Sequence, residues 1–146
     1  AAQEEEMRQN MEELQATQEE SSRKTAEMHG LIEALNISSY VIEYDTEGYI
    51  RDINDNYLNL IELTREEVIG THHSGNIQFT DSQKIEYERF WIELRQGKVK
   101  KETTRIKIKE KEYLFAETYT PIKNEDGDVY KILKISNNIS EFNKNK

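Results

Sequence analysis

Apolar side chains in the first 35 residues recur at alternating spacings of four and three residues. This is the repeat of the buried seam of a left-handed coiled coil. The segment has no Pro, and most of its residues are good helix formers. A helix this polar needs a partner surface, and we expect a parallel homodimer, with packing against its own domain as the alternative. The nine seam positions, polar at the centre, are Met7, Met11, Leu14, Gln18, Ser21, Thr25, Met28, Ile32 and Leu35.

The pattern changes near Asn36, where short runs of alternating apolar and polar residues begin. Runs rich in β-branched and aromatic residues predict strands, and helical spacing behind Thr-initiated capping boxes predicts short helices. The order helix, two strands, three helices, three strands predicts an α+β fold with an antiparallel sheet and helices on one face. The expected elements span residues 3–35, 40–44, 49–53, 54–63, 64–70, 80–97, 98–109, 113–122 and 129–135.

Composition supports a boundary near Asn36. Large apolar residues other than Ala number seven in residues 1–35 and 38 in residues 36–146, and all 13 aromatic residues lie in the second segment. The first segment has nine acidic and three basic residues, so it holds −6 of the net charge of −9. Only the second segment can bury a core of its own. We therefore expect a coiled-coil helix over 1–35, a globular domain over 36–142 and a polar tail over 143–146.

Several classes of protein are disfavoured by the composition. A net charge of −9 argues against a nucleic-acid binder, which presents a basic surface to phosphates. The chain has no Cys, which excludes disulfides and thiolate metal sites, and no apolar run long enough to span a membrane. No phosphate-binding Gly-rich loop or clustered acidic motif is present. We therefore expect no enzymatic activity, no metal site, no nucleic-acid partner and no direct membrane contact.

Five short motifs occur in the order and spacing found in PAS domains, and residues 31–142 resemble that family. They resemble the opening hairpin, the start of the first short helix, the "EExxG" motif, the "PIxDxxG" hairpin (with Asn124 in place of its Asp) and the exit segment of the family. In this sequence they span residues 44–50, 54–58, 66–70, 119–127 and 135–140. The resemblance implies a five-stranded antiparallel sheet with short helices on one face, and a role in sensing rather than catalysis.

Three further segments resemble the PAS modules of bacterial chemoreceptors and sensor histidine kinases. Two lie in the globular part, over residues 70–73 and 87–97, and the third covers residues 6–20 of the helix, which are similar to the coiled linker before such modules. The resemblance implies a cytoplasmic module, in a parent protein that is soluble or membrane-anchored. It also implies an effector domain elsewhere in that parent, in a two-component or chemoreceptor system.

The family's ligand pocket lies between the helical insert and the inner face of the sheet. Flavin-binding relatives have a His and an Asn at positions that match His73 and Asn54, but the base that follows is absent from residues 74–78. Haem-binding relatives use an axial His in the same region, and an imidazole is available here. The missing Cys excludes the flavin–thiol adduct of light-sensing relatives. The sequence therefore identifies no cofactor, and a pocket that binds none remains an alternative.

Each candidate ligand-binding residue also has a structural interpretation. Asn54 is placed to cap the first short helix, and His72 or His73 can cap a segment or lie in solvent. Trp91 and Tyr87 share an aromatic helix face, which suits a core anchor as well as a ligand. At the exit, Asn138, Ile139 and Ser140 stand where the family has an Asp-Ile-Thr motif that joins the sheet to the outgoing helix, and a simple strand end is the alternative.

The sequence therefore predicts a PAS sensor module that relays the state of a ligand, cofactor or partner through a dimeric coiled-coil helix. Two alternatives remain at this point. One is a constitutive dimerisation and spacer module, with its pocket filled by its own Tyr and Trp side chains. The other is a redox sensor that carries haem or flavin.

Overall fold

The computed structural model describes residues 2–75 and 77–140, so the predicted tail over 143–146 lies outside the described residues. The chain divides into two compact units, Ala1–Leu35 and Asn36–Lys146. Helix α1 spans Ala2–Ser38, and none of its residues is buried. Its apolar seam side chains, such as Met11 and Leu14, are exposed. Among the described residues, no helix is long and apolar enough to cross a membrane.

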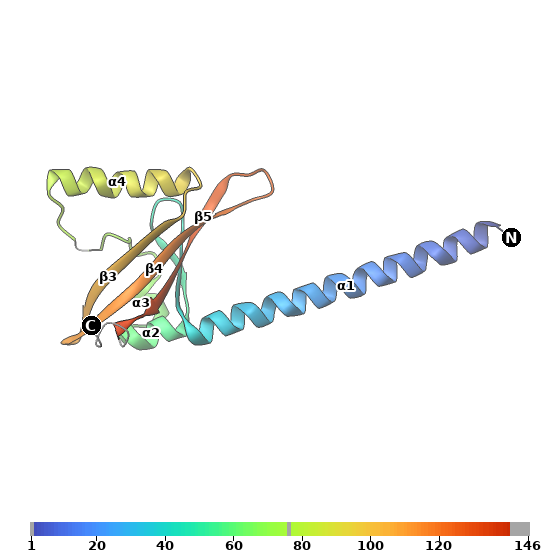
Figure 1. Ribbon diagram of the computed structural model, residues 1–146, viewed down its shortest axis with the longest axis horizontal. Helices are drawn as coiled ribbons and strands as arrows, with labels where there is room; N and C mark the ends of the chain where they lie inside the picture. The colour runs from blue at the N-terminus through green and yellow to red at the C-terminus, as the bar shows by residue number, and fades with distance from the viewer. Residues whose placement is uncertain (1, 76, 141–146) are drawn as a thin grey trace. The chain divides into compact units, whose positions relative to one another are not determined.

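The second unit is built on one five-stranded antiparallel sheet, which confirms the predicted fold class (Figure 1). The strands lie in the order β2-β1-β5-β4-β3, so the hairpin β1–β2 joins the edge of β5 and β3 forms the opposite edge. The strand bounds are β1 Tyr40–Tyr44, β2 Ile50–Ile53, β3 Lys100–Ile108, β4 Lys111–Lys123 and β5 Val129–Asn138.

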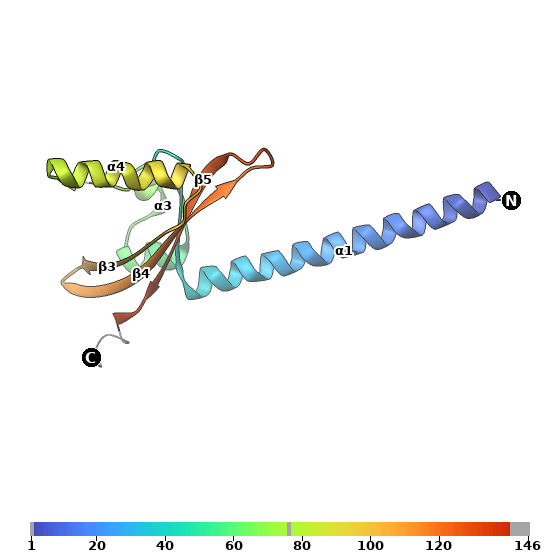
Figure 2. The ribbon, with the colours of Figure 1, turned by 45° about the horizontal axis from the view of Figure 1, so that its top comes forward.

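Three helices connect β2 to β3, as the capping signals predict (Figure 2). They are α2 (Asp55–Ile61), α3 (Arg65–Val68) and α4 (Asp81–Arg95). Thr64 and Thr80 each close a capping box, in which the Thr hydroxyl accepts from the backbone of the third helical residue and that residue's side chain accepts in return. Both predicted capping boxes are therefore confirmed.

The core lies between the inner face of the sheet and these helices. Alternate residues of the central strands point inward, which is why each strand buries every second residue. From the helices, Tyr57, Leu58, Val68, Trp91 and Leu94 pack against them. The inward positions of β1, β4 and β5 are Ile42, Tyr44, Phe115, Glu117, Tyr119, Ile132, Lys134 and Ser136.

Several predicted strand ends differ from the structure by one to three residues, and two of these differences have a clear cause in the strand pairing. The turn between β3 and β4 contains only Lys109 and Glu110, both at positive φ. Such a two-residue turn twists with the strands, so β4 begins at Lys111 rather than at residue 113. The second is the C-terminal end of β5, which continues to Asn138, paired with Phe115, rather than ending at residue 135.

The exit segment therefore stays attached to the sheet where the sequence predicts that it leaves. The backbone N–H of Ile139 donates to the carbonyl of Leu114 at 2.8 Å, and the hydroxyl of Ser140 accepts from the N–H of Leu114 at 2.9 Å. The side chain of Asn138 accepts from the N–H of Ser140. β4 is long enough to offer these groups partners, which is why the ladder continues through Asn138.

Candidate functional site

A cavity of about 630 Å³ lies between α4 and the edge of the sheet formed by β3, β4 and β5. We call it the α4–sheet cavity. Its volume is within the range of small-molecule sites, about 300–1,000 Å³. It is lined by His73, Ile77, Gln78, Phe79, Gln83, Glu86, Tyr87, Phe90, Glu102, Thr104, Ile106, Glu117, Tyr119 and Lys134. Aromatic rings and carboxylates dominate the described lining.

His73 lies between two tyrosine hydroxyls at one end of this cavity. Its Nδ1 is 3.0 Å from the hydroxyl of Tyr87, and its Nε2 is 2.8 Å from the hydroxyl of Tyr119. Burial, together with the positive charge of Lys134, lowers the pKa of His73 to about 4. The imidazole is therefore neutral near pH 7, so one of its nitrogens donates a hydrogen bond and the other accepts one.

A buried ion pair joins Glu117 and Lys134 at 2.7 Å, with side chains only 3% and 8% exposed. Glu117 also accepts hydrogen bonds from the hydroxyls of Thr104 at 2.6 Å and Ser136 at 3.3 Å. Burial alone would raise the pKa of Glu117, but Lys134 and these bonds lower it. A buried ion pair with its oxygens hydrogen-bonded in this way can stay charged inside the domain.

Glu102 stands directly opposite Glu117 across β3 and β4. Glu102 is exposed, but partial desolvation beside β4 and the nearby negative charge of Glu117 raise its pKa. Lys100, the nearest base on the same face of the strand, pairs with Glu93 of α4. Glu102 therefore brings a carboxylate to the cavity without an ion-pair partner among the described residues.

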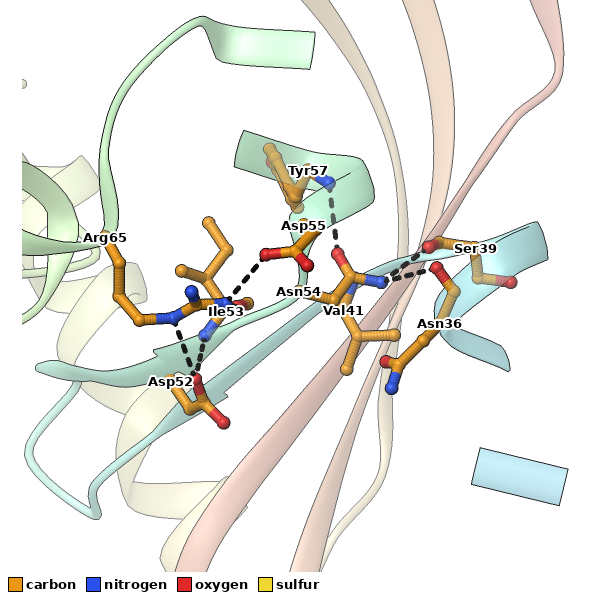
Figure 3. A network of polar contacts seen from close by, with 9 residues as sticks. All are labelled: Asn36, Ser39, Val41, Asp52, Ile53, Asn54, Asp55, Tyr57 and Arg65. Atoms are coloured by element: carbon orange, nitrogen blue, oxygen red, sulfur yellow. Dashed lines mark hydrogen bonds and ion pairs between the residues drawn. The ribbon is translucent and has the colours of Figure 1, made fainter. Parts of the chain in front are cut away.

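Asn54 is the centre of a second polar cluster, which ties the end of α1 to the sheet and to α2 (Figure 3). Its Oδ1 accepts from the backbone N–H of Tyr57 at 3.1 Å and of Val41 at 3.2 Å. Its Nδ2 donates to the carbonyls of Ser39 at 2.8 Å and Asn36 at 3.4 Å. All four hydrogen-bonding positions of this amide are thus used, and the bond from Tyr57 makes Asn54 the N-cap of α2.

Only two of the five predicted ligand-binding residues, His73 and Tyr87, line the α4–sheet cavity. Asn54 belongs to the cluster of Figure 3. The ring of His72 contacts the carbonyl of Glu47 at 2.7 Å and the hydroxyl of Ser74 at 2.8 Å. Asn54 and His72 therefore have structural roles, in the cap of α2 and in the loop contacts of His72, rather than a place in the cavity.

Trp91 is a core residue, only 4% exposed, that packs edge-on against the ring of Tyr44. Its indole N–H finds no acceptor among the described residues. A Cβ at Gly48, which has a φ of +92°, would lie 2.9 Å from Nε2 of His72 and 3.1 Å from the ring of Trp91. The positive φ, His72 and Trp91 together favour glycine at the β1–β2 turn, and the position of Trp91 is set by packing rather than by the cavity.

Sequence reasoning missed the carboxylates and the lysine of the cavity. Along β4, the inward positions are Phe115, Glu117 and Tyr119. Along β5, they are Ile132, Lys134 and Ser136, so each charged residue takes a position between two other buried ones. A charged residue at a position that the alternation assigns to the core is a signal that could have been read. Burying a lone charge is costly, so two such residues on neighbouring strands indicate a pair.

Comparison with known proteins identifies the class of protein. A PAS domain family model matches residues 37–141, so the chain belongs to the PAS domain family. This supports the coarse prediction of a PAS sensor domain. Over 107 residues the chain is 32% identical to the biofilm dispersion protein BdlA of Pseudomonas aeruginosa. The match covers 73% of this chain and 26% of that protein.

Solved structures agree on the fold. A PAS domain from Colwellia psychrerythraea has a TM-score of 0.59 at 20% identity, and the match covers 78% of this chain and 98% of that one. A light-oxygen-voltage domain studied with a flavin analogue has the same score and identity over 80% of this chain and 93% of its own. The PAS domain of the fruit-fly ELK potassium channel scores 0.55 at 18% identity, with 70% and 87% covered.

The described lining of the α4–sheet cavity does not fit haem or a flavin nucleotide. An axial ligand to haem iron needs a free nitrogen, but both nitrogens of His73 contact tyrosine hydroxyls. The propionates of haem and the phosphate of a flavin nucleotide need cations. Lys134 is the one Lys or Arg in the described lining, and Glu117 already pairs with it.

Proposed function

We propose that this chain is a cytoplasmic PAS sensor module of a bacterial chemoreceptor or sensor histidine kinase. A small ligand enters the α4–sheet cavity and shifts the sheet between two states. The ligand does so by binding these states with different affinity. Helix α1 passes the change on as one strand of a parallel dimeric coiled coil, and an effector elsewhere in the parent protein responds.

The observation that carries this proposal is a continuous series of contacts from the cavity to the end of α1. The ammonium of Lys134, in the cavity lining, lies 5.8 Å from the ring centre of Tyr57. The N–H of Tyr57 donates to Asn54, whose amide donates to the carbonyl of Ser39, the residue after α1. A change in the ion pair can therefore reach the helix end through groups in direct contact.

The seam of α1 supports a coil that can move. Its apolar side chains at both ends are exposed, so a second copy of the helix would bury them. At the polar centre, the hydroxyl of Thr25 donates to the carbonyl of Ser21 in its own helix at 2.9 Å. A centre that is held weakly costs stability, and it permits a change of register or rotation between two helices.

Single cysteines test the dimer, because the chain has none of its own. We expect Leu14→Cys, Gln18→Cys and Ser21→Cys to form disulfide-linked dimers under mild oxidation. Gln15→Cys lies next to the seam but outside it, and serves as the matched control. Absence of a disulfide dimer at all three seam positions would contradict the dimeric coil.

The relay is tested by Asn54→Ser in the Gln18→Cys background. Serine keeps an acceptor for the cap of α2 but is too short to reach the carbonyls of Asn36 and Ser39. We expect a changed rate of crosslinking at residue 18, whereas Asn59→Ser, at an exposed position of α2, leaves the rate unchanged. Equal crosslinking rates with and without Asn54→Ser in the Gln18→Cys background would show that Asn54 is not part of the relay.

A constitutive dimerisation and spacer module is the second candidate. It is favoured by the buried polar groups of the cavity, His73, Glu117 and Lys134, which all have partners within the domain. On this alternative, the seam crosslinks form as before but do not respond to Asn54→Ser or to any added small molecule.

A further inference from the structure

We infer that the α4–sheet cavity binds a small organic cation: an ammonium or amidinium group carried on an aromatic or aliphatic body. This inference rests on the proposed function in taking the cavity as the ligand site. It adds the chemical class of the ligand, which follows from the charges and rings that line the cavity.

The charge of the described lining is negative after its internal pair is set aside. Three carboxylates, from Glu86, Glu102 and Glu117, face one ammonium, from Lys134. Because Lys134 and Glu117 pair at 2.7 Å, the carboxylates of Glu86 and Glu102 remain. Neither forms an ion pair with any residue in 2–75 or 77–140, and a ligand cation would supply the missing charge.

Three bases border these carboxylates from outside the cavity. Arg89, Lys100 and Lys101 line an adjoining cleft that shares Glu86 and Glu102, and Lys100 is paired there with Glu93. None of the three bases forms an ion pair with Glu86 or Glu102 within the described residues. They are also absent from the described lining of the α4–sheet cavity itself. If these bases nevertheless set the local charge, the cavity would prefer an anion, and probes of opposite charge separate the two cases.

The walls of the cavity are aromatic. Phe79 stacks on Tyr87 with ring centres 4.7 Å apart, and Phe90 lies edge-on to Tyr119 at 4.9 Å. Ring faces attract cations within about 6 Å. The domain already uses this attraction, since the ammonium of Lys134 lies 5.5 Å from the ring centre of Tyr119. A second cation can therefore be held between these rings and Glu102.

An anionic or neutral ligand would be held less well. A carboxylate or phosphate would meet two carboxylates and find no unpaired cation in the described lining. A neutral ligand would displace water from Glu102 without replacing its hydration by an opposite charge, which is unfavourable. The neutral His73, with both nitrogens on tyrosine hydroxyls, adds no charge at its end of the cavity.

Three probes with the same phenyl group test the inference on the full chain: 2-phenylethylammonium, 2-phenylethanol and 3-phenylpropionate. Binding is followed by amide NMR shifts near pH 7, because the net charge of −9 attracts cations to the whole surface and the shifts locate the site. We expect the cation to bind about tenfold more tightly than the other two, from an ion pair and a cation–π contact together. Its shifts should centre on residues 77–90 and 102–106.

Glu102→Gln should remove most of this preference while keeping the shape of the site. Glu125→Gln changes the net charge equally at an exposed turn and should leave the preference intact. Urea unfolding of both variants shows whether the domain is folded. Equal affinity for the three probes, tighter binding of the anion, or no binding at millimolar concentration would each overturn the inference.

Failure of this inference and failure of the relay give different results. If the cation binds in the cavity but the crosslinking at residue 18 does not change, the ligand class stands and the proposed relay fails. If the anion or the neutral probe binds and changes the crosslinking, the relay stands and the ligand class is overturned.

Discussion

Both units of the molecule contain ion pairs, but the pairs on α1 are exposed and the pair inside the sheet domain is buried, so they differ in how much stability depends on them. On α1, Arg8 lies 3.6 Å from Glu12, with side chains 62% and 66% exposed. On the inner face of the sheet, Lys134 lies 2.7 Å from Glu117, and both are nearly excluded from solvent. Exposed pairs are weak because water competes for both charges. A buried pair has already lost its hydration, so removing one partner leaves an uncompensated charge.

The two units also differ in how tightly their charges define a structure. Each exposed pair on α1 adds only a little to the stability of the helix, and the apolar seam stays exposed. The buried pair contacts the hydroxyls of Thr104 and Ser136 and lies beside the ring of Tyr57. Polar groups that are buried and hydrogen-bonded to one another therefore favour one arrangement of the cavity.

The largest expected effect comes from Lys134→Met, which leaves Glu117 buried without its cation. We expect a loss of about 3–5 kcal/mol in the free energy of unfolding, measured by urea denaturation near pH 7. Lys107→Met, at an exposed position of β3, is the matched control and should change stability little.

The double variant Glu117→Gln/Lys134→Met sharpens this result. It removes both charges, so it should recover a large part of the lost stability relative to Lys134→Met alone. A double variant as unstable as the single one would show that packing of the lysine stem, rather than charge, explains the loss.

The next effect is a pH dependence that arises at His73. The pKa of His73 is about 4 in the folded chain and near 6.5 when unperturbed. Between these values the unfolded chain takes up a proton that the folded chain does not. Stability therefore falls as the pH falls from 6.5 towards 4, by at most about 1.4 kcal/mol per pH unit from this group.

His73→Gln should flatten that slope, while His29→Gln, on the exposed helix, should leave it unchanged. Slopes of unfolding free energy against pH are compared, because the absolute stability of His73→Gln also reflects its lost tyrosine contacts. An unchanged slope in His73→Gln would show that folding does not lower the pKa of this imidazole.

Asn54 should give an intermediate effect that needs no charge. Asn54→Ala removes the cap of α2 and leaves backbone groups at Ser39 and Val41 with lost partners, for a cost of about 2 kcal/mol. Asn54→Ser restores the cap and should recover about 1 kcal/mol of that. Equal stabilities of the two variants would mean that the cap contributes nothing measurable.

The smallest effect is expected on α1. Arg8→Gln should change the helix content by an amount that corresponds to at most about 0.5 kcal/mol, because its pairs with Glu5 and Glu12 are exposed. Circular dichroism at low and high salt measures this, and any difference should vanish at high salt. A loss comparable to that of Lys134→Met would mean that burial does not decide the strength of these ion pairs.

The fold was largely predictable because its signals are local. Capping at Thr64 and Thr80, the glycine turns and the alternation along the strands each depend on a few neighbouring residues. The prediction failed at the ends of β4 and β5, where a ladder continues as long as its partner strand offers free backbone groups. The sequence alone does not specify the length of that partner.

The candidate site was predictable only in part. His73 and Tyr87 were expected at the pocket and line the cavity, whereas Asn54 and Trp91 serve the helix cap and the core. Glu117, which is buried, and Glu102, which is exposed but lines the cavity, were missed because the family resemblance pointed to aromatic and imidazole groups. A carboxylate in a strand looks solvent-exposed until the register places it beside another strand.

By itself the sequence determined the order of the elements, the boundary near Asn36 and the exposed seam of α1, because these follow from spacing and composition along the chain. Only the tertiary structure decided which charges meet. Lys134 and Glu117 lie far apart in the sequence, and the antiparallel register of β4 and β5 brings them together. The same sheet places Glu102 opposite Glu117 and makes the cavity acidic, a property that no segment of the chain carries alone.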